Sequence, residues 1–289
     1  MRKILVTALL VSLTVGPAVA AGQSVGAAGT TPAAGSVPTG RDDAGPDPTD
    51  EPDWTPSTAR SQTLARDDAS RSRVSNAMMK RFARERVKRG DRDLSPTHIN
   101  HVREVQYRLR WVGLYRGHIN GVFNFKTQKA VKAFQQRKGL KRSGKMGYNT
   151  WPTLIKKSIR GRGDIPRYCK QDGWRICYDR SRHQVVLWHN GRVHNSWLVR
   201  GGGAGTKTRT GKFRVYYRSR HHVSSLYNTP MPYAQFFDGG QAFHASYYMV
   251  NPFSGHSHGC VNMYIKDARQ LWALTAHKRL LVRIYGAWS

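Results

Sequence analysis

Residues 243–263 read FHASYYMVNPFSGHSHGCVNM and hold one cysteine, Cys260, among the histidines His244, His256 and His258. A thiol is a strong nucleophile only as the thiolate, which a nearby imidazole can generate. Directly after the cysteine, apolar residues recur at helical spacing from about residue 266 to residue 277. The pattern predicts a cysteine on a tight Gly-containing turn that leads into a helix.

A zinc site is one interpretation of this stretch. His256, His258 and Cys260 stand at alternate positions, whereas zinc ligands usually have knuckle or helical spacing such as CxxC or HxxxH. The nearest acids in sequence, Asp238 and Asp267, give no clear general base for a zinc-bound water. We therefore expect neither a metal nor another cofactor here.

A thiol–imidazole pair is the other interpretation. Cys260 would be the nucleophile, and N–H groups of the turn through His258, Gly259 and Cys260 would stabilise an oxyanion. His258, two residues away, would face the same side of an extended segment, while His244 would come from an adjoining strand. The residues alone leave both histidines as candidates for the base.

The motif Ser-His-Gly-Cys-Val-Asn at residues 257–262, with His244 sixteen residues before the cysteine, resembles the signature of the L,D-transpeptidase catalytic domain. The run TRTGKFRV, residues 208–215, is similar to the TPTGxFxV strand of that family, with Arg209 in place of the usual proline. Met231-Pro232-Tyr233 resembles the actinobacterial branch, in which this tripeptide lies on the loop beside the substrate.

The resemblance implies that Cys260 attacks a carbonyl carbon and holds the acyl group as a thioester. His244 would be the general base, oriented by the backbone carbonyl of Ala245, and His258 is the competing base. The N–H groups of Gly259 and Cys260 would form the oxyanion hole. The resemblance also implies residues that shape the turn or bind substrate, namely Ser257, His258, Asn262, Met231 and Tyr233.

The implied reaction is acyl transfer between peptidoglycan stems in cell-wall biogenesis, which contributes to cell shape. A tetrapeptide stem is cleaved after its third residue, and the side-chain amine of another stem accepts the acyl group, which gives a 3→3 cross-link. Water as the acceptor would make the protein an L,D-carboxypeptidase, and a non-catalytic wall-binding protein is a further alternative. The resemblance also implies that carbapenems acylate Cys260.

Residues 98–159 are expected to form a small three-helix domain. Val102, Val105 and Leu109 share one helical face, Thr127 is expected to cap a second helix, and a third helix starts near Asn149. The run at residues 102–140 is similar to the peptidoglycan-binding domain 1 family, with Asn120 where Asp is common. This resemblance implies docking on cell-wall peptidoglycan.

Residues 165–286 are expected to form a mostly-β sandwich with one covering helix. The predicted strands are short, aromatic and β-branched, and span 174–178, 184–188, 193–199, 213–217, 242–248 and 280–285. The Gly-rich run GGGAGTKTRTGKF is not a phosphate loop, because Lys212 is followed by Phe213, and we expect a hairpin loop there. The fold class is thus α+β with several domains.

The three cysteines are consistent with an exported protein. Residues 1–20 combine Arg2 and Lys3 with an apolar run and small residues, which predicts a signal peptide rather than a membrane span. Cys169 and Cys177 flank an Asp-Gly turn and are expected to form a disulfide, so that Cys260 is the free thiol.

Residues 21–97 are expected to be a disordered linker with a basic end, in which residues 76–93 could form a short helix. The formal net charge is +31, and from His98 onward 34 Lys and Arg face six acidic residues. Such a surface attracts polyanions. In an exported protein we expect these to be anionic cell-wall polymers, and no motif indicates nucleic acid.

Overall fold

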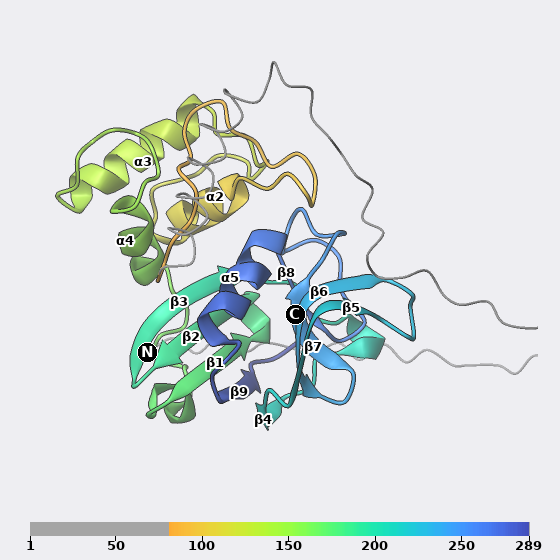
Figure 1. Cartoon of the computed structure of the whole chain (residues 1–289). Coiled ribbons are helices and arrows are strands. Elements are labelled where there is room, and N and C mark those ends of the chain that lie inside the picture. Colours follow the sequence, from red (N-terminus) through yellow and green to blue (C-terminus); the bar gives the residue numbers. More distant parts are fainter. Residues whose placement is uncertain (1–80, 289) are drawn as a thin grey trace, which may run out of the picture. The chain divides into compact units, whose positions relative to one another are not determined.

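The computed structural model describes residues 81–288 of the chain (Figure 1). Two β-sheets form its C-terminal part. One sheet has the order β3-β2-β1-β9-β4 and the other the order β5-β6-β7-β8. The strands are β1 (Trp174–Asp179), β2 (Gln184–His189), β3 (Arg192–Leu198), β4 (Gly211–Arg214), β5 (Tyr217–Val223), β6 (Pro230–Asp238), β7 (Gln241–Ala245), β8 (Val261–Met263) and β9 (Leu280–Tyr285). Both sheets are mixed, because β1 pairs with β9 and β7 with β8 in parallel.

One apolar core joins the two sheets and helix α5 (Ile265–Thr275). The first sheet contributes residues such as Leu187 and Val282, and the second contributes Phe243 and Val261, all fully buried. Helix α5 adds Ala268 and Leu271 and packs against β6 and β7 (Figure 1). The expected two-layer β-domain with a covering helix is therefore confirmed.

Three helices form the upstream domain, as predicted. They are α2 (Val102–Trp111), α3 (Phe125–Arg137) and α4 (Thr150–Lys157). The apolar face Val102, Val105 and Leu109 is fully buried against residues of the other two helices. The expected cap at Thr127 is wrong, because Asn124 caps α3 by accepting the backbone N–H of Thr127 at 3.0 Å.

Residues 81–97 pack onto the helical domain, whereas the sequence predicted a linker up to residue 97 and a short helix over 76–93. Val87 exchanges two backbone hydrogen bonds with Met146, at 3.0 and 2.7 Å. Phe82 and Val87 are buried in the apolar cluster of the three helices. The described part contains turns and isolated bridges, since its sparse apolar side chains anchor an extended segment rather than one helical face.

Buried charges tie this segment and α2 to α5. Glu104 lies 3.1 Å from Arg84 and 2.7 Å from Arg108, and Arg84 also lies 3.4 Å from Asp267. His101 bridges Asp267 at 3.0 Å and Glu85 at 2.8 Å. Burial alone would lower the pKa of His101, but these two carboxylates raise it to about 10. The charged imidazole thus stabilises the fold at neutral and acidic pH, and this contribution is lost as the pH rises toward that value.

Three strands were not predicted from the sequence. These are β5, β6 and the three-residue β8, the last of which separates Cys260 from the helix that was expected to follow it directly. The Gly-rich run after β3 is not a hairpin loop. It connects β3 to β4, and these strands lie at opposite edges of their sheet.

The predicted disulfide between Cys169 and Cys177 is present, with the two Cα atoms 6.1 Å apart. Both cysteines are buried in a small apolar cluster with Ile159, Ile165 and Trp188. Cys260 is the free cysteine.

No helix within residues 81–288 is long and apolar enough to cross a membrane. The expected signal peptide, and the linker up to residue 80, lie outside the described residues.

The buried charges predict a large effect for Glu104→Gln. This change leaves Arg84 and Arg108 buried without their shared carboxylate, so we expect the free energy of unfolding to fall by about 3–5 kcal/mol. Chemical denaturation measures the loss. Asp164→Asn is the matched control, because Asp164 is 65% exposed in its pair with Arg182, and it should cost less than about 1 kcal/mol. Equal losses for both variants would contradict the interpretation.

Candidate active site

The parallel pairing of β7 with β8 brings the two halves of the predicted site together. His244 on β7 lies opposite Asn262 on β8, and Cys260 lies just before β8. Residues at paired positions project from the same face of a sheet. His244, Asn262 and Cys260 all line one cavity of about 450 Å³.

The imidazole of His244 has a defined orientation. Its Nδ1 lies 2.7 Å from the carbonyl oxygen of Ala245, the contact expected from the sequence. Since a carbonyl only accepts hydrogen bonds, Nδ1 carries the proton and Nε2 has its lone pair free. The pKa of His244 is lowered to about 4, mainly by burial; the Ala245 bond opposes this, and the charges of His222 and Arg200 contribute to the lowering. The ring is therefore neutral at neutral pH and can accept a proton.

The thiol of Cys260 is in the neutral form as well. Burial raises its pKa, and a backbone contact from Ala242 lowers it only in part. Its Sγ donates a weak hydrogen bond to the carbonyl oxygen of Gly240 at 3.6 Å. The thiol of Cys260 and the imidazole of His244, which line the same cavity, are therefore both in their neutral forms.

Ser257 holds the turn that presents the cysteine. Its Oγ donates to the carbonyl oxygen of Cys260 at 2.6 Å and accepts the N–H of Gly259 at 3.1 Å. The N–H of Gly259, expected in the oxyanion hole, is thus engaged by Ser257 in this structure. Gly259 has φ +116°, and a Cβ there would lie 2.5 Å from Nε2 of Gln241, so only glycine fits.

The Gly-rich run GGGAGTKTRTGKF packs directly against this turn. Gly202 bridges to Ser257, and a Cβ at Gly202 would lie 2.9 Å from Cα of Gly259 and 1.9 Å from the carbonyl oxygen of Thr206. The sequence reading missed this function of the run. The sequence feature that could have indicated it is the cluster of glycines without a phosphate-loop pattern, because glycines allow two backbone segments to approach closely.

The predicted substrate-side residues separate into two groups. Met231 lines the cavity together with Ser257, His258 and Asn262. Tyr233 does not line it. Its φ of +59° interrupts the alternation of β6, and its ring packs against Trp272 with the ring centres 6.2 Å apart.

His258 is less suited to be the base. It is exposed, and its ring stacks on Tyr227 with the centroids 4.3 Å apart and the planes 20° apart. Tyr227 belongs to the connection between β5 and β6. The stack places His258 at the wall of the cavity, whereas the imidazole of His244 is only 7% exposed.

Several lining residues were not expected from the sequence, namely Arg200, Arg209, Ser224, Tyr227, Ser246, Tyr248 and His256. Arg209 had been noted only as a departure from a family pattern. The others come from three separate connections, so no local motif joins them. Only the strand pairing brings them to one place.

One group of side chains within residues 81–288 has the spacing to hold a metal ion: His101, Glu104 and Asp267, with ligand atoms within 4.8 Å of one another. Arg84 and Arg108 pair with these carboxylates. The group is best described as an ion-pair cluster.

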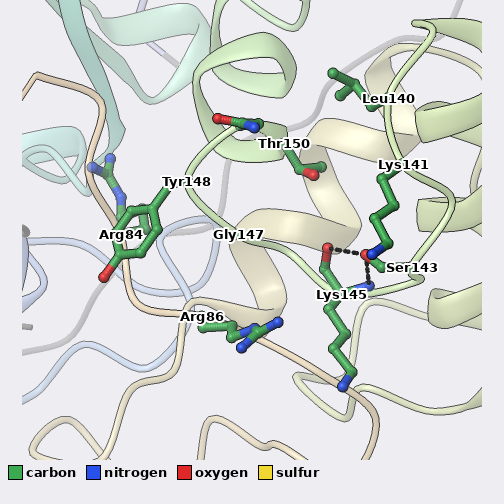
Figure 2. A pocket seen from close by; sticks show the side chains of 10 residues that line it. Arg84, Arg86, Leu140, Lys141, Ser143, Lys145, Gly147, Tyr148 and Thr150 are labelled. Atoms are coloured by element: carbon green, nitrogen blue, oxygen red, sulfur yellow. Dashed lines mark hydrogen bonds between the residues drawn. The ribbon is translucent and has the colours of Figure 1, made fainter.

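A second cavity, of about 410 Å³, lies in the helical domain. Arg86, Lys141 and Lys145 line it with Tyr148, and Ser143 holds the intervening turn through hydrogen bonds to the backbone of Lys145 (Figure 2). Gln135 braces the same turn by accepting the N–H of Gly144 at 2.8 Å. The cavity is basic and lies on a fixed loop.

Two domain families match the chain. Residues 173–284 match the L,D-transpeptidase catalytic domain, and residues 99–154 match a peptidoglycan-binding domain. The chain thus combines a catalytic domain of the L,D-transpeptidase family with an upstream peptidoglycan-binding domain. Both resemblances expected from the sequence are confirmed.

Solved structures with partial similarity include three L,D-transpeptidases. That from Stackebrandtia nassauensis is 23% identical, over 72% of this chain and 98% of its own, with a TM-score of 0.45. That from Xylanimonas cellulosilytica is 26% identical, over 70% and 98%, with a TM-score of 0.41. One from Mycobacterium tuberculosis is 19% identical, over 39% and 57%, with a TM-score of 0.36. A search among curated proteins found no match.

The neutral resting pair predicts the pH dependence of alkylation at Cys260. Because burial raises the pKa of the thiol, we expect the rate with iodoacetamide to keep rising through neutral pH and beyond the ordinary thiol range. Mass spectrometry of the labelled protein measures the rate, and Cys260→Ala should take up no label. A rate plateau between about pH 5 and pH 8 would instead indicate a thiolate–imidazolium pair.

Proposed function

We propose that the protein is an exported L,D-transpeptidase that forms 3→3 cross-links between peptidoglycan stems through a thioester at Cys260. One observation carries the proposal: the free thiol of Cys260 shares a cavity with the buried imidazole of His244, whose Nδ1 is held by Ala245. The match of this region to the L,D-transpeptidase catalytic domain supports it.

The first half-reaction forms the thioester. Nε2 of His244 takes the thiol proton as Sγ of Cys260 attacks the carbonyl carbon of the third stem residue. The carbonyl oxygen becomes an oxyanion, for which we propose the N–H of Cys260 as a donor. The N–H of Gly259 can join once its bond to Ser257 opens. The C–N bond then breaks, and the proton on His244 passes to the departing D-Ala amine.

The second half-reaction transfers the acyl group. The side-chain amine of an acceptor stem attacks the thioester carbonyl and loses a proton to His244. The C–S bond breaks, and Cys260 recovers its proton from the imidazolium. Water in place of the amine would release a tripeptide, so transpeptidase and L,D-carboxypeptidase activity differ only in the nucleophile that reaches the thioester.

Residues around the thiol would hold the stem. We propose that Asn262 and Met231 contact the donor from β8 and β6, since both line the cavity. Ser257 and His258 would keep the turn and one wall in place, as their hydrogen bonds and ring stack indicate. Tyr233 would act indirectly, through its packing on Trp272.

The upstream domain would bring the enzyme to its polymer. We propose that residues 98–159 dock on peptidoglycan and residues 165–286 carry out catalysis, with residues 1–20 as a signal peptide. The basic cavity at Arg86, Lys141 and Lys145 supports a contact with anionic wall polymers. Such binding should weaken as salt concentration rises.

The product of a purified reaction tests the proposed activity. Mature protein incubated with a disaccharide-tetrapeptide should yield a cross-linked dimer, detected by mass, because the acceptor amine competes with water for the thioester. Cys260→Ala should yield none. A tripeptide as sole product would identify a carboxypeptidase, and an unchanged substrate would identify a binding protein.

Replacement of each histidine separates the two candidate bases. We expect His244→Ala to slow acylation of Cys260 by a carbapenem by about a hundredfold or more, and His258→Ala by less than about tenfold. The covalent adduct is followed by intact mass, and Cys260→Ala should show no added mass. A larger loss for His258→Ala would assign the base to His258.

A further inference from the structure

Arg200 lies on the segment next to the proposed active-site residues, on the same face. Its backbone N–H donates to the carbonyl oxygen of Asn262 at 3.0 Å, and its carbonyl oxygen accepts the N–H of Asn262 at 2.8 Å. Asn262 in turn lies opposite His244. Since paired residues share a face, the side chains of these three residues point to the same side. All three line the cavity that holds Cys260.

The guanidinium of Arg200 is buried but has only neutral partners. The residue is 8% exposed. Its terminal nitrogens donate to the carbonyl oxygens of Ser254 and Tyr248, both at 3.2 Å, and its Nε has no acceptor within residues 81–288. A guanidinium has five N–H donors, so most of them are unused. Burial lowers the pKa of Arg200, yet arginine stays charged at neutral pH.

The cavity supplies no anion for this charge. Within the described residues, none of the side chains that line it is acidic. The other arginine at the cavity, Arg209, already pairs with Asp238 at 2.5 Å. A buried charge without a counter-ion is costly, and a ligand of opposite charge relieves that cost. The site is therefore suited to an anionic group of its ligand.

We propose that Arg200 binds a free carboxylate of the donor stem and selects stems in which that carboxylate is not amidated. This inference rests on the proposed function, because it takes the stem peptide as the ligand. A guanidinium binds a carboxylate with two parallel hydrogen bonds, which fixes orientation as well as position. The donor stem can carry two free carboxylates: the C-terminal one of D-Ala and, where the third residue is a dicarboxylic diamino acid, the one at the end of that side chain.

Carboxylate binding would also assist the chemistry. The positive charge of Arg200 is one of the causes that lower the pKa of His244. A carboxylate beside Arg200 neutralises that charge and makes the imidazolium less unfavourable. Proton transfer from Cys260 to His244 is then favoured when the donor is in place, rather than in the free enzyme.

The test compares stems that differ in one carboxylate. Three donors are used: a tetrapeptide stem with both carboxylates free, one with a C-terminal carboxamide, and one with an amidated diamino acid. We expect the wild type to prefer the free acid over one of the amides by about ten- to a hundredfold in kcat/KM. The amide that loses activity identifies which carboxylate Arg200 binds.

Variants of Arg200 should remove this preference. Arg200→Gln keeps an N–H donor for the neighbouring carbonyls but removes the charge, so the ratio between free acid and amide should fall to about one. Arg200→Lys should keep part of the ratio. Arg209→Met is the matched control, since it removes a charge at the same cavity that Asp238 already neutralises, and it should keep the ratio.

A purely structural role gives a different result. If Arg200 only holds the carbonyls of Ser254 and Tyr248, Arg200→Gln lowers turnover of all stems by one factor and leaves the ratio unchanged. That outcome overturns the proposal. Equal turnover of all three donors by the wild type overturns it as well.

Binding to an inactive variant separates this inference from the proposed function. Calorimetry with Cys260→Ala should show tighter binding of the free acid than of the amide, and Cys260→Ala/Arg200→Gln should show no difference. If the wild type turns over no stem but this pattern holds, the proposed activity fails and the carboxylate site stands. If Cys260→Ala binds acid and amide equally, the carboxylate site is rejected.

Discussion

The site depends on one structural constraint, the parallel pairing of β7 with β8. This pairing places His244 opposite Asn262. An isolated β-bridge then pairs Asn262 with Arg200, so that the three residues lie side by side on neighbouring segments. Residues far apart in sequence thereby project from one face into one cavity. A shift of one residue in this register would turn the side chain of His244 into the core, away from Cys260. The chemistry is thus set by strand pairing and only secondarily by the loop that carries the cysteine.

The turn before β8 is held by close backbone packing from beneath. Gly202 and Gly259 approach so closely that a side chain on Gly202 would meet the backbone of Gly259, while Gln241 fills the other side. Ser257 then closes the turn with its two hydrogen bonds. The turn that presents the thiol is therefore held by close packing, and in the proposed mechanism the bond from Gly259 to Ser257 is the part of it that opens.

Local patterns in the sequence predicted those parts of the structure whose signals are local. The apolar face Val102, Val105 and Leu109 and the disulfide across the Asp-Gly turn were both confirmed. The contact between His244 and Ala245 is present too, but it was implied by the resemblance to the L,D-transpeptidase family rather than by a local pattern. Strands β5 and β6 were missed, because β5 is mostly exposed and has no apolar alternation, and because Pro230, Pro232 and the positive φ of Tyr233 interrupt β6. The packing of residues 81–97 was also missed, because it depends on Arg84 meeting Glu104 and Asp267, and sequence spacing carries no information on such partners.

The energetic cost of burying an arginine is offset in two different ways in this protein, by a carboxylate of the fold or, as proposed, by a ligand. Arg84 and Arg108 share Glu104, so the fold itself supplies their anion and the charges are neutralised before any ligand arrives. Arg200 is also buried, although less deeply than Arg84 and Arg108, and it has only carbonyl oxygens as partners within the described residues. Carbonyl dipoles stabilise a guanidinium less than a carboxylate does. The fold therefore leaves one favourable interaction unmade in the cavity of Cys260. If Arg200 served packing alone, an acidic neighbour would make its burial more favourable. If Arg200 binds an anionic ligand, an acidic neighbour would repel that ligand and abolish binding.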